Sequence, residues 1–352
     1  MRVLLISGSR ADLGSLEPVY QALIRHQVES TLIRSESIFD GLKLNQAETA
    51  AHFMKWAAVH SIDYSMVIVC GDRFEILGAV IGVFLNKIPI VHLSGGDITE
   101  GSADDSMRHA ISKLSHLHYT ATVESAKHVI QMGDEPWRVK VVGEPSVDNL
   151  KLMDLKDAKK EAGIERFASN FCIVLYHPDT LVDNFHVLAE AIIVTGALSR
   201  FNNDMLVIGP NTDVGNEQIR QHFNSWASLR EVEAPTHYVE NLPRQVYLTL
   251  LANCSTLIGN SSSGYFEAPS FGTPVVDIGD RQKGRIKSAN IVHCGIVYNE
   301  IIDAVNTALK KERIEITNPY HTGSAADQIA HDISRIKDPR KLLLKRFYQI
   351  RH

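Results

Sequence analysis

Carboxylates are concentrated in one stretch of the sequence, HLSGGDITEGSADDSMRH, which covers residues 92–109. Its four acids, Asp97, Glu100, Asp104 and Asp105, follow an apolar run and lead into a helical pattern. One aspartate can cap that helix, and acids in a first turn favour the helix dipole. Four acids exceed what capping requires. Because crowded carboxylates push one another's pKa values apart, we expect one to act as a base and another as an acid.

Two further turns place charged residues directly after apolar runs. In CGDRFE, Asp72 and Arg73 end one such run and open a helical pattern. Asp72 either caps that helix or, beside the acidic loop, takes part in catalysis. In SGSRADLG, which follows the first run, small residues allow the backbone to turn tightly. Arg10 in that turn is either a phosphate contact or a solvated side chain.

Two loops in the second half of the chain have the same position relative to an apolar run. His177 in LYHPDT precedes a proline, which stops strand pairing and fixes the loop. At the end of a strand such a histidine is a candidate for function as well as for packing. Asn211 lies in GPNTDVG, where turn chemistry alone also explains it.

The segment GNSSSGYFEAPSFG has the composition of an anion site. Ser261 and Ser262 lead into a predicted helix, and hydroxyls together with free N–H groups at a helix start bind anions. Glu267 can accept two hydrogen bonds from a ribose diol, and Arg281 can add charge beside a diphosphate. The alternative is a set of serine caps followed by a solvated basic loop.

These residues require elements that bring them to one edge of a sheet. Short apolar runs, which predict buried strands, alternate with helical patterns, as is typical of βαβ units and parallel sheets. The predicted strands are residues 2–7, 66–70, 89–93, 139–142, 171–176, 205–209, 256–259 and 274–278. The predicted helices are residues 16–25, 74–85, 104–115, 124–132, 183–198, 243–252, 264–271 and 339–348.

A charged stretch that ends near residue 170 separates two series of these elements and predicts a linker. We therefore expect an α/β architecture of two Rossmann-like, doubly wound domains, residues 1–160 and 161–335. Residues 336–352 are expected to form a helix that packs back on the first domain. Because ligands bind beyond the carboxyl ends of parallel strands, the turns of both domains are expected to face a cleft.

Composition excludes several classes of protein. The chain has 36 basic and 41 acidic residues, a formal net charge of −5, which argues against a nucleic-acid or membrane-surface partner. No apolar stretch reaches the ~20 residues that span a bilayer. No metal motif, dinucleotide fingerprint or P-loop occurs. The four cysteines show no CxxC spacing and predict reduced thiols of a cytoplasmic protein.

Several blocks, taken together and in order, resemble the hydrolysing UDP-N-acetylglucosamine 2-epimerase family of the sialic- and legionaminic-acid pathways. They are GSRAD, GDRFE, GGDITEGSADDSMRHAISKLSHLH, YHPDT, PNTDVG and GNSSSGYFEAPSFGTPVVDIGDRQ. The resemblance covers most of the chain. It implies a GT-B-like fold that binds UDP, a UDP-linked amino sugar as substrate, no metal or nicotinamide cofactor, and a homodimer or homotetramer.

The resemblance also implies roles for individual residues. Asp72 and Asp104 match the family's catalytic carboxylates, and Arg10 and Arg73 would face the phosphate and the sugar. The implied contacts to the nucleotide are His177, Asn211, Ser261, Ser262, Glu267 and Arg281.

Two departures from the family pattern stand out. Ser94 occupies a position where relatives carry Glu or His, and Asp97 replaces a Glu. In addition, residues 31–44 stand where the family places a Gly–His loop and a mobile segment.

The implied reaction converts UDP-N-acetylglucosamine and water to N-acetylmannosamine and UDP, by anti elimination to a glycal and then hydration. It needs two proton-transfer groups, for which Asp72, Asp97 and Asp104 are candidates with base and acid unassigned, and His177 would neutralise the leaving UDP. The alternatives are the same reaction on UDP-2,4-diacetamido-2,4,6-trideoxyglucose, a non-hydrolysing epimerase and a retaining glycosyltransferase. A catalytically weak UDP-sugar binding protein is the alternative of a different class.

Overall fold

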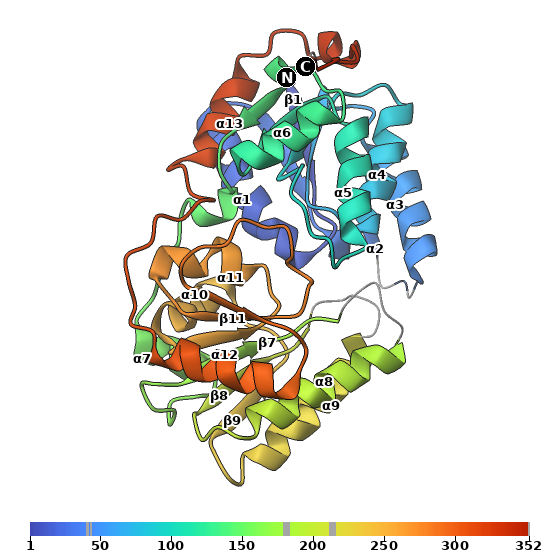
Figure 1. Cartoon of the computed structure of the whole chain (residues 1–352). Coiled ribbons are helices and arrows are strands. Elements are labelled where there is room, and N and C mark those ends of the chain that lie inside the picture. The colour runs from blue at the N-terminus through green and yellow to red at the C-terminus, as the bar shows by residue number, and fades with distance from the viewer. Residues whose placement is uncertain (40–41, 43, 179–183, 211–215, 351–352) are drawn as a thin grey trace. The chain divides into compact units, whose positions relative to one another are not determined.

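The computed structural model describes residues 1–39, 42, 44–178, 184–210 and 216–350 (Figure 1). The chain divides into two compact units. Unit 1 comprises Met1–Ile98, Ala103–Asn149 and Pro319–His352, and unit 2 comprises Thr99–Ser102 and Leu150–Asn318. Each unit contains one six-stranded parallel sheet covered by helices, which confirms the predicted α/β class with two doubly wound domains.

Unit 1 has the strand order β2-β1-β3-β4-β5-β6, in which every neighbouring pair is parallel. Its strands are β1 (Arg2–Ile6), β2 (Glu29–Ile33), β3 (Met66–Cys70), β4 (Ile90–Leu93), β5 (Leu117–Thr120) and β6 (Val139–Val141). Its helices are α1 (Arg10–Arg25), α2 (Ser35–Phe39), α3 (Gln46–His60), α4 (Phe74–Leu85), α5 (Asp104–Leu114), α6 (Val123–Gln131) and α13 (Ala325–Ser334). Short 3-10 helices cover Pro136–Arg138, Pro145–Val147 and Pro339–Leu343.

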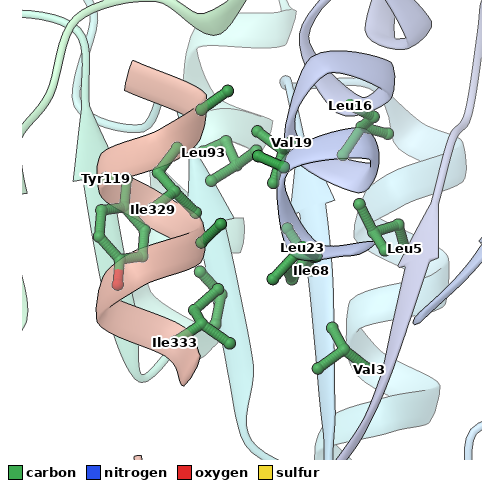
Figure 2. Close-up of a cluster of buried hydrophobic side chains, with 14 of the residues drawn as sticks. Val3, Leu5, Leu16, Val19, Leu23, Ile68, Leu93, Tyr119, Ile329 and Ile333 are labelled. Carbon is green, nitrogen blue, oxygen red and sulfur yellow. The ribbon is translucent and has the colours of Figure 1, made fainter. Parts of the chain in front are cut away.

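Two apolar layers hold the unit 1 sheet. One side packs against α3 and α4, where Phe53 and Ala57 are fully buried. The other side packs against α1 and α13, and Figure 2 shows Ile329 and Ile333 of α13 beside side chains of α1. The sequences of the central strands are continuous apolar runs because both faces of the sheet are covered.

The C-terminal segment belongs to unit 1 from Pro319 onward. From the sequence, the chain was expected to return to the first domain only at residue 336. The return begins earlier because α13 supplies part of the core. The predicted helix over residues 339–348 is wrong, since only a 3-10 turn over Pro339–Leu343 forms. The buried Arg138 guanidinium donates to the backbone oxygens of Leu342 and Leu344, at 2.9 and 2.7 Å, which holds this segment as extended chain.

Unit 2 has the strand order β12-β11-β10-β7-β8-β9, again entirely parallel. Its strands are β7 (Cys172–Leu175), β8 (Met205–Ile208), β9 (Thr236–Val239), β10 (Thr256–Gly259), β11 (Val275–Ile278) and β12 (Ile291–Cys294). Its helices are α7 (Leu155–Glu161), α8 (Asn184–Leu198), α9 (Asn216–Arg230), α10 (Arg244–Asn253), α11 (Ser263–Phe266) and α12 (Tyr298–Lys310). A 3-10 helix covers Ala268–Phe271.

Two local predictions fail in unit 2. The charged stretch before residue 170 is part of the unit, because Ala158, Ala162 and Ile164 are buried in a core with α10. The units therefore divide after Asn149, whereas the sequence placed the boundary at residue 160. The helix predicted over residues 264–271 is one α turn followed by a 3-10 turn, since Pro269 lacks the amide hydrogen that a continuous α-helix requires.

All four cysteines are buried and free, as expected. Among the described residues, no helix is long and apolar enough to cross a membrane.

Candidate functional site

In unit 1 the strand order reverses between β1 and β3, and ligands of doubly wound sheets bind at such a switch point. The loop after β1 leads into Asp12, whose carboxylate oxygen Oδ2 accepts from the amides of Gly8 and Ser9, both at 2.9 Å. Burial raises the pKa of Asp12 to about 7, with Arg73 opposing the rise and Asp72 adding to it. Asp12 was not among the residues predicted from the sequence.

The loop after β3 carries Asp72, and the buried Arg108 of α5 holds it. The Arg108 guanidinium forms an ion pair with the Asp72 carboxylate. The same guanidinium donates to the backbone oxygen of Asp97 at 2.8 Å and to Asp105 at 3.3 Å. Burial disfavours the charged guanidinium, but the three carboxylates outweigh it, and the pKa of Arg108 lies above its ordinary value. Arg108 therefore gathers the acidic residues that follow β3 and β4.

A second buried side chain fixes the backbone of the same loop. Nε2 of His92 donates to the Gly71 oxygen at 2.9 Å, and Nδ1 lies 3.0 Å from the Ser112 hydroxyl, from which it accepts. Burial lowers the pKa of His92 to about 3, so the ring is neutral and keeps both hydrogen bonds. Asp72 is thus positioned through the backbone by His92 and through its carboxylate by Arg108.

The acids of the loop after β4 occupy different surroundings. The Asp97 side chain is buried, and its Oδ1 accepts from the Ser125 hydroxyl at 2.5 Å, at the start of α6. Asp104 is the first residue of α5 and is half-buried. Glu100 belongs with unit 2, where it pairs with Lys283 at 2.9 Å. Asp72 and Asp97 are therefore joined through Arg108, whereas Glu100 forms an exposed ion pair.

Of the two arginines predicted in unit 1, the structure describes the side chain of Arg73 but not that of Arg10. Arg73 is buried, and its guanidinium pairs with both carboxylate oxygens of Glu75, at 3.1 and 3.2 Å. Its contact with a phosphate or sugar stays a prediction. Arg10 is the first residue of α1, and the position of its side chain lies outside the description.

In unit 2 the strand order reverses between β7 and β10, and one side chain joins the loops that follow them. Asn260, buried after β10, accepts from the His177 amide at 2.7 Å. Its amide group donates to the His177 oxygen at 2.9 Å. The His177 backbone is thus fixed at the switch point, where a ligand of this fold binds. Asn211 falls outside the described residues.

The serine segment follows directly after Asn260. Ser261 and Ser262 are half-buried, and the Ser261 hydroxyl accepts from the Ser263 amide at 3.3 Å. Arg281, after β11, donates to the Asn260 backbone oxygen at 3.4 Å. The predicted hydroxyls and the predicted cation therefore lie around one buried asparagine.

Glu267 lies on the other side of the short α11 turn. Its carboxylate is buried and pairs with the guanidinium of Arg244 at 3.3 Å. Arg244 was not among the predicted residues. The contact between Glu267 and a ribose stays a prediction.

Sequence reasoning missed three residues that organise these loops. Arg108 lies inside the acidic stretch, four residues after Asp104, so helical spacing could have identified it. Asn260 directly follows a predicted strand, and its side chain could have been predicted to hydrogen-bond to the backbone of a neighbouring loop. Glu144 lies beyond β6 with no motif around it, yet its carboxylate accepts from the Ser94 hydroxyl at 2.5 Å. Within the described residues, no three His, Cys, Asp or Glu side chains are grouped to hold a metal ion.

Comparison with known proteins identifies one protein family. A family profile described as UDP-N-acetylglucosamine 2-epimerase matches residues 41–334. The chain is 32% identical, over 75% of its length and 69% of the relative's, to the hydrolysing UDP-N,N'-diacetylbacillosamine 2-epimerase of Legionella pneumophila. It is 28% identical, over 96% of its length and 95% of the relative's, to the UDP-N-acetylglucosamine 2-epimerase of Neisseria meningitidis.

Solved structures agree on the fold. The UDP-GlcNAc 2-epimerase of Methanocaldococcus jannaschii, solved with UDP-GlcNAc and UDP, superposes with a TM-score of 0.80 at 18% identity, covering 95% of this chain and 99% of that one. The Neisseria meningitidis enzyme bound to UDP-GlcNAc gives a TM-score of 0.77 at 18% identity, with 95% and 99% coverage. Both therefore have the same fold as this chain. The chain described here belongs to the UDP-N-acetylglucosamine 2-epimerase family.

Proposed function

We propose that this protein is a hydrolysing 2-epimerase that converts UDP-N-acetylglucosamine and water to N-acetylmannosamine and UDP. One observation carries the proposal. Buried Arg108 holds Asp72 at the C-terminal edge of the unit 1 sheet, while 25% of the Asp72 side chain stays exposed to a ligand. A carboxylate fixed in this way is suited to remove a proton from a bound sugar, since its position is set before the substrate arrives.

The reaction proceeds in two steps. A carboxylate takes the proton from the carbon that bears the acetamido group, the bond between the anomeric carbon and the diphosphate oxygen breaks, and a glycal remains. Water then adds at the anomeric carbon, and a proton returns to the neighbouring carbon from the opposite face. Asp72, Asp97 and Asp104 are the proposed proton-transfer groups, and their division between base and acid stays open.

Unit 2 is proposed to bind UDP. Ser261 and Ser262 would donate hydroxyls to the diphosphate, and Arg281 would supply positive charge as UDP leaves. His177, whose backbone Asn260 fixes, would face the nucleotide at the switch point. Glu267 would accept from the ribose hydroxyls, with Arg244 holding its carboxylate in place.

A second substrate has specific support. Two relatives, at 32% and 34% identity, carry names for hydrolysing epimerases of diacetylbacillosamine nucleotides. UDP-2,4-diacetamido-2,4,6-trideoxyglucose is therefore the alternative substrate for the same chemistry. Both sugars carry the 2-acetamido group beside the anomeric carbon, so the proposed proton transfers are unchanged.

The test is to incubate the purified protein in D₂O with each nucleotide sugar and to analyse the products by NMR. We expect free sugar and UDP, with one deuterium at the epimerised carbon. Recovery of an epimerised UDP-sugar without free sugar would assign a non-hydrolysing epimerase. Free sugar without deuterium would refute the elimination route, and binding without turnover would assign a UDP-sugar binding protein.

A further inference from the structure

A second carboxyl group reaches the same edge of the unit 1 sheet as Asp72. Glu144 follows β6 and is only 2% exposed. Its Oε2 accepts from the hydroxyl of Ser94, the residue directly after β4, at 2.5 Å. Its Oε1 accepts from the hydroxyl of Ser15 in α1, also at 2.5 Å. Because Cys70 pairs with Leu93 in neighbouring β3 and β4, the loops of Asp72 and Ser94 begin side by side.

Glu144 differs from Asp72 in its electrostatic surroundings. Within the described part of the chain, no Lys, Arg or His forms an ion pair with Glu144, whereas Asp72 pairs with Arg108. Burial raises the pKa of Glu144, and the charge of Asp97 adds to the rise against three opposing hydrogen bonds. A buried carboxyl without a cation favours its protonated form, which carries a proton that can be given away.

The residue that carries this hydroxyl, Ser94, has a strained backbone. Its φ is 59°, in the left-handed region that favours glycine, and its amide donates to the Tyr119 oxygen at 2.9 Å. Non-glycine residues seldom adopt this conformation. The side chain is half-buried beside Glu144, at the C-terminal end of β4. Strain of this kind, kept at the end of a strand that faces a ligand site, points to a function for the side chain.

We propose that Ser94 is a catalytic residue that passes a proton from Glu144 to the glycal intermediate. This inference rests on the proposed function and assigns its second proton transfer to Ser94, so that Asp72, Asp97 and Asp104 are the candidates for the elimination step. Ser94 would face the sugar, and Glu144 would act behind it as the proton reservoir and positioning residue. Ser15 holds the second oxygen of Glu144, which keeps Oε2 directed at Ser94.

The step balances as follows. The structure shows the Ser94 hydroxyl donating to Glu144. When Glu144 is protonated this bond reverses, so that the carboxyl donates to the Ser94 oxygen and the Ser94 hydroxyl turns toward the sugar. The Ser94 O–H bond then breaks as its proton joins the carbon that bears the acetamido group, and Glu144 transfers its own proton to the Ser94 oxygen. Water supplies the hydroxyl on the anomeric carbon, and the proton that water loses restores Glu144 through the solvent. The proton removed in the elimination step leaves to the solvent with UDP.

The relay predicts that elimination and hydration separate in variants. Glu144→Gln keeps the shape of the side chain but cannot give up the carboxyl proton. We expect it to release UDP at close to the wild-type rate while free epimer forms about 100-fold more slowly, so that glycal accumulates. Ser94→Ala should do the same, and the double variant should be no slower than the slower single one, because the two groups act in series.

The measurement follows UDP, glycal and free sugar in single-turnover reactions by NMR, together with a pH profile. In the wild type, epimer formation should fall on the alkaline side as Glu144 loses its proton, and this limb should be absent in Glu144→Gln. Glu135→Gln, the same change at a residue that pairs with Arg138 and accepts from the Arg346 amide, should leave all rates unchanged. Ser94→Gly relieves the backbone strain, so it provides a folded variant without the hydroxyl.

The outcomes are distinguishable. If the wild type forms no free sugar from either nucleotide sugar, the proposed function fails and the relay with it. If the wild type turns over and Glu144→Gln forms epimer at the wild-type rate without glycal, the relay alone is refuted. Equal loss of UDP release and epimer formation, or multiplicative effects in the double variant, would also overturn it.

Discussion

Asp12→Asn should make unit 1 more stable than the wild type at alkaline pH. Asp12 is 7% exposed, and burial raises its pKa to about 7 from the ordinary value of 3.8. A group whose pKa is raised on folding stabilises the fold fully below the unfolded value. That stabilisation is lost as pH rises through the folded value. Asparagine keeps an acceptor for the Gly8 and Ser9 amides but never ionises.

The size of the effect follows from the two pKa values. Compared with a side chain that never ionises, the titration of Asp12 destabilises the fold by about 1.7 kcal/mol at pH 5, where only the unfolded chain ionises, and by about 4.3 kcal/mol at pH 8. The difference in free energy of unfolding between Asp12→Asn and the wild type should therefore grow by roughly 2.5 kcal/mol from pH 5 to pH 8. Above pH 8 it should change little, since Asp12 is then ionised in both states.

The assay is urea denaturation at several pH values, followed by tryptophan fluorescence. A Trp226→Phe background in both proteins leaves Trp56 and Trp137 as reporters, and both lie in unit 1. Comparing the two proteins at each pH cancels the titration of all other groups. A free-energy difference that stays constant between pH 5 and pH 8 would refute the argument that burial governs this carboxylate.

The remaining predictions concern activity, backbone and thiols. Asp72→Asn and Asp104→Asn should each lower turnover about 100-fold or more and leave UDP binding nearly intact, as calorimetry and initial rates will show; wild-type rates in both would remove their assignment. Gly96→Ala should lower the thermal midpoint more than Gly323→Ala does. Both glycines have positive φ, but only at Gly96 would the new Cβ meet backbone, 2.1 Å from the Ser125 oxygen; equal shifts would contradict this. Burial raises the pKa of all four thiols, that of Cys172 to about 12, so a thiol reagent should react at least 100-fold faster in denaturant than with the folded protein.

Two edge strands are among the elements that sequence patterns left out. The strands over Glu29–Ile33 and Thr236–Val239 lie at the edges of their sheets and mix polar with apolar residues. A strand with one neighbour is less covered, so its sequence lacks the continuous apolar run of a central strand. The helix Ala325–Ser334 was missed for another reason, because its packing partner α1 lies about 300 residues earlier in the chain.

The sequence by itself determined which polar groups follow the strands of each unit. Carboxylates after the strands of the first half, and serines with an arginine after those of the second, follow from residue type and from the rule that parallel strands share a carboxyl edge. Alternating apolar runs and helical patterns also determined the α/β class. Central strands are buried on both faces, so their sequences are continuous apolar runs that can be recognised.

Only the tertiary structure decided which of these groups work together. Arg108 joins Asp72, Asp97 and Asp105, and Glu144 meets Ser15 across 129 residues of chain. Such contacts depend on how strand ends and helices converge in space, and no local pattern encodes a partner at that separation. Tertiary structure likewise determines which carboxylate has a cation beside it and which is buried without one, and that difference sets their protonation and their proposed roles.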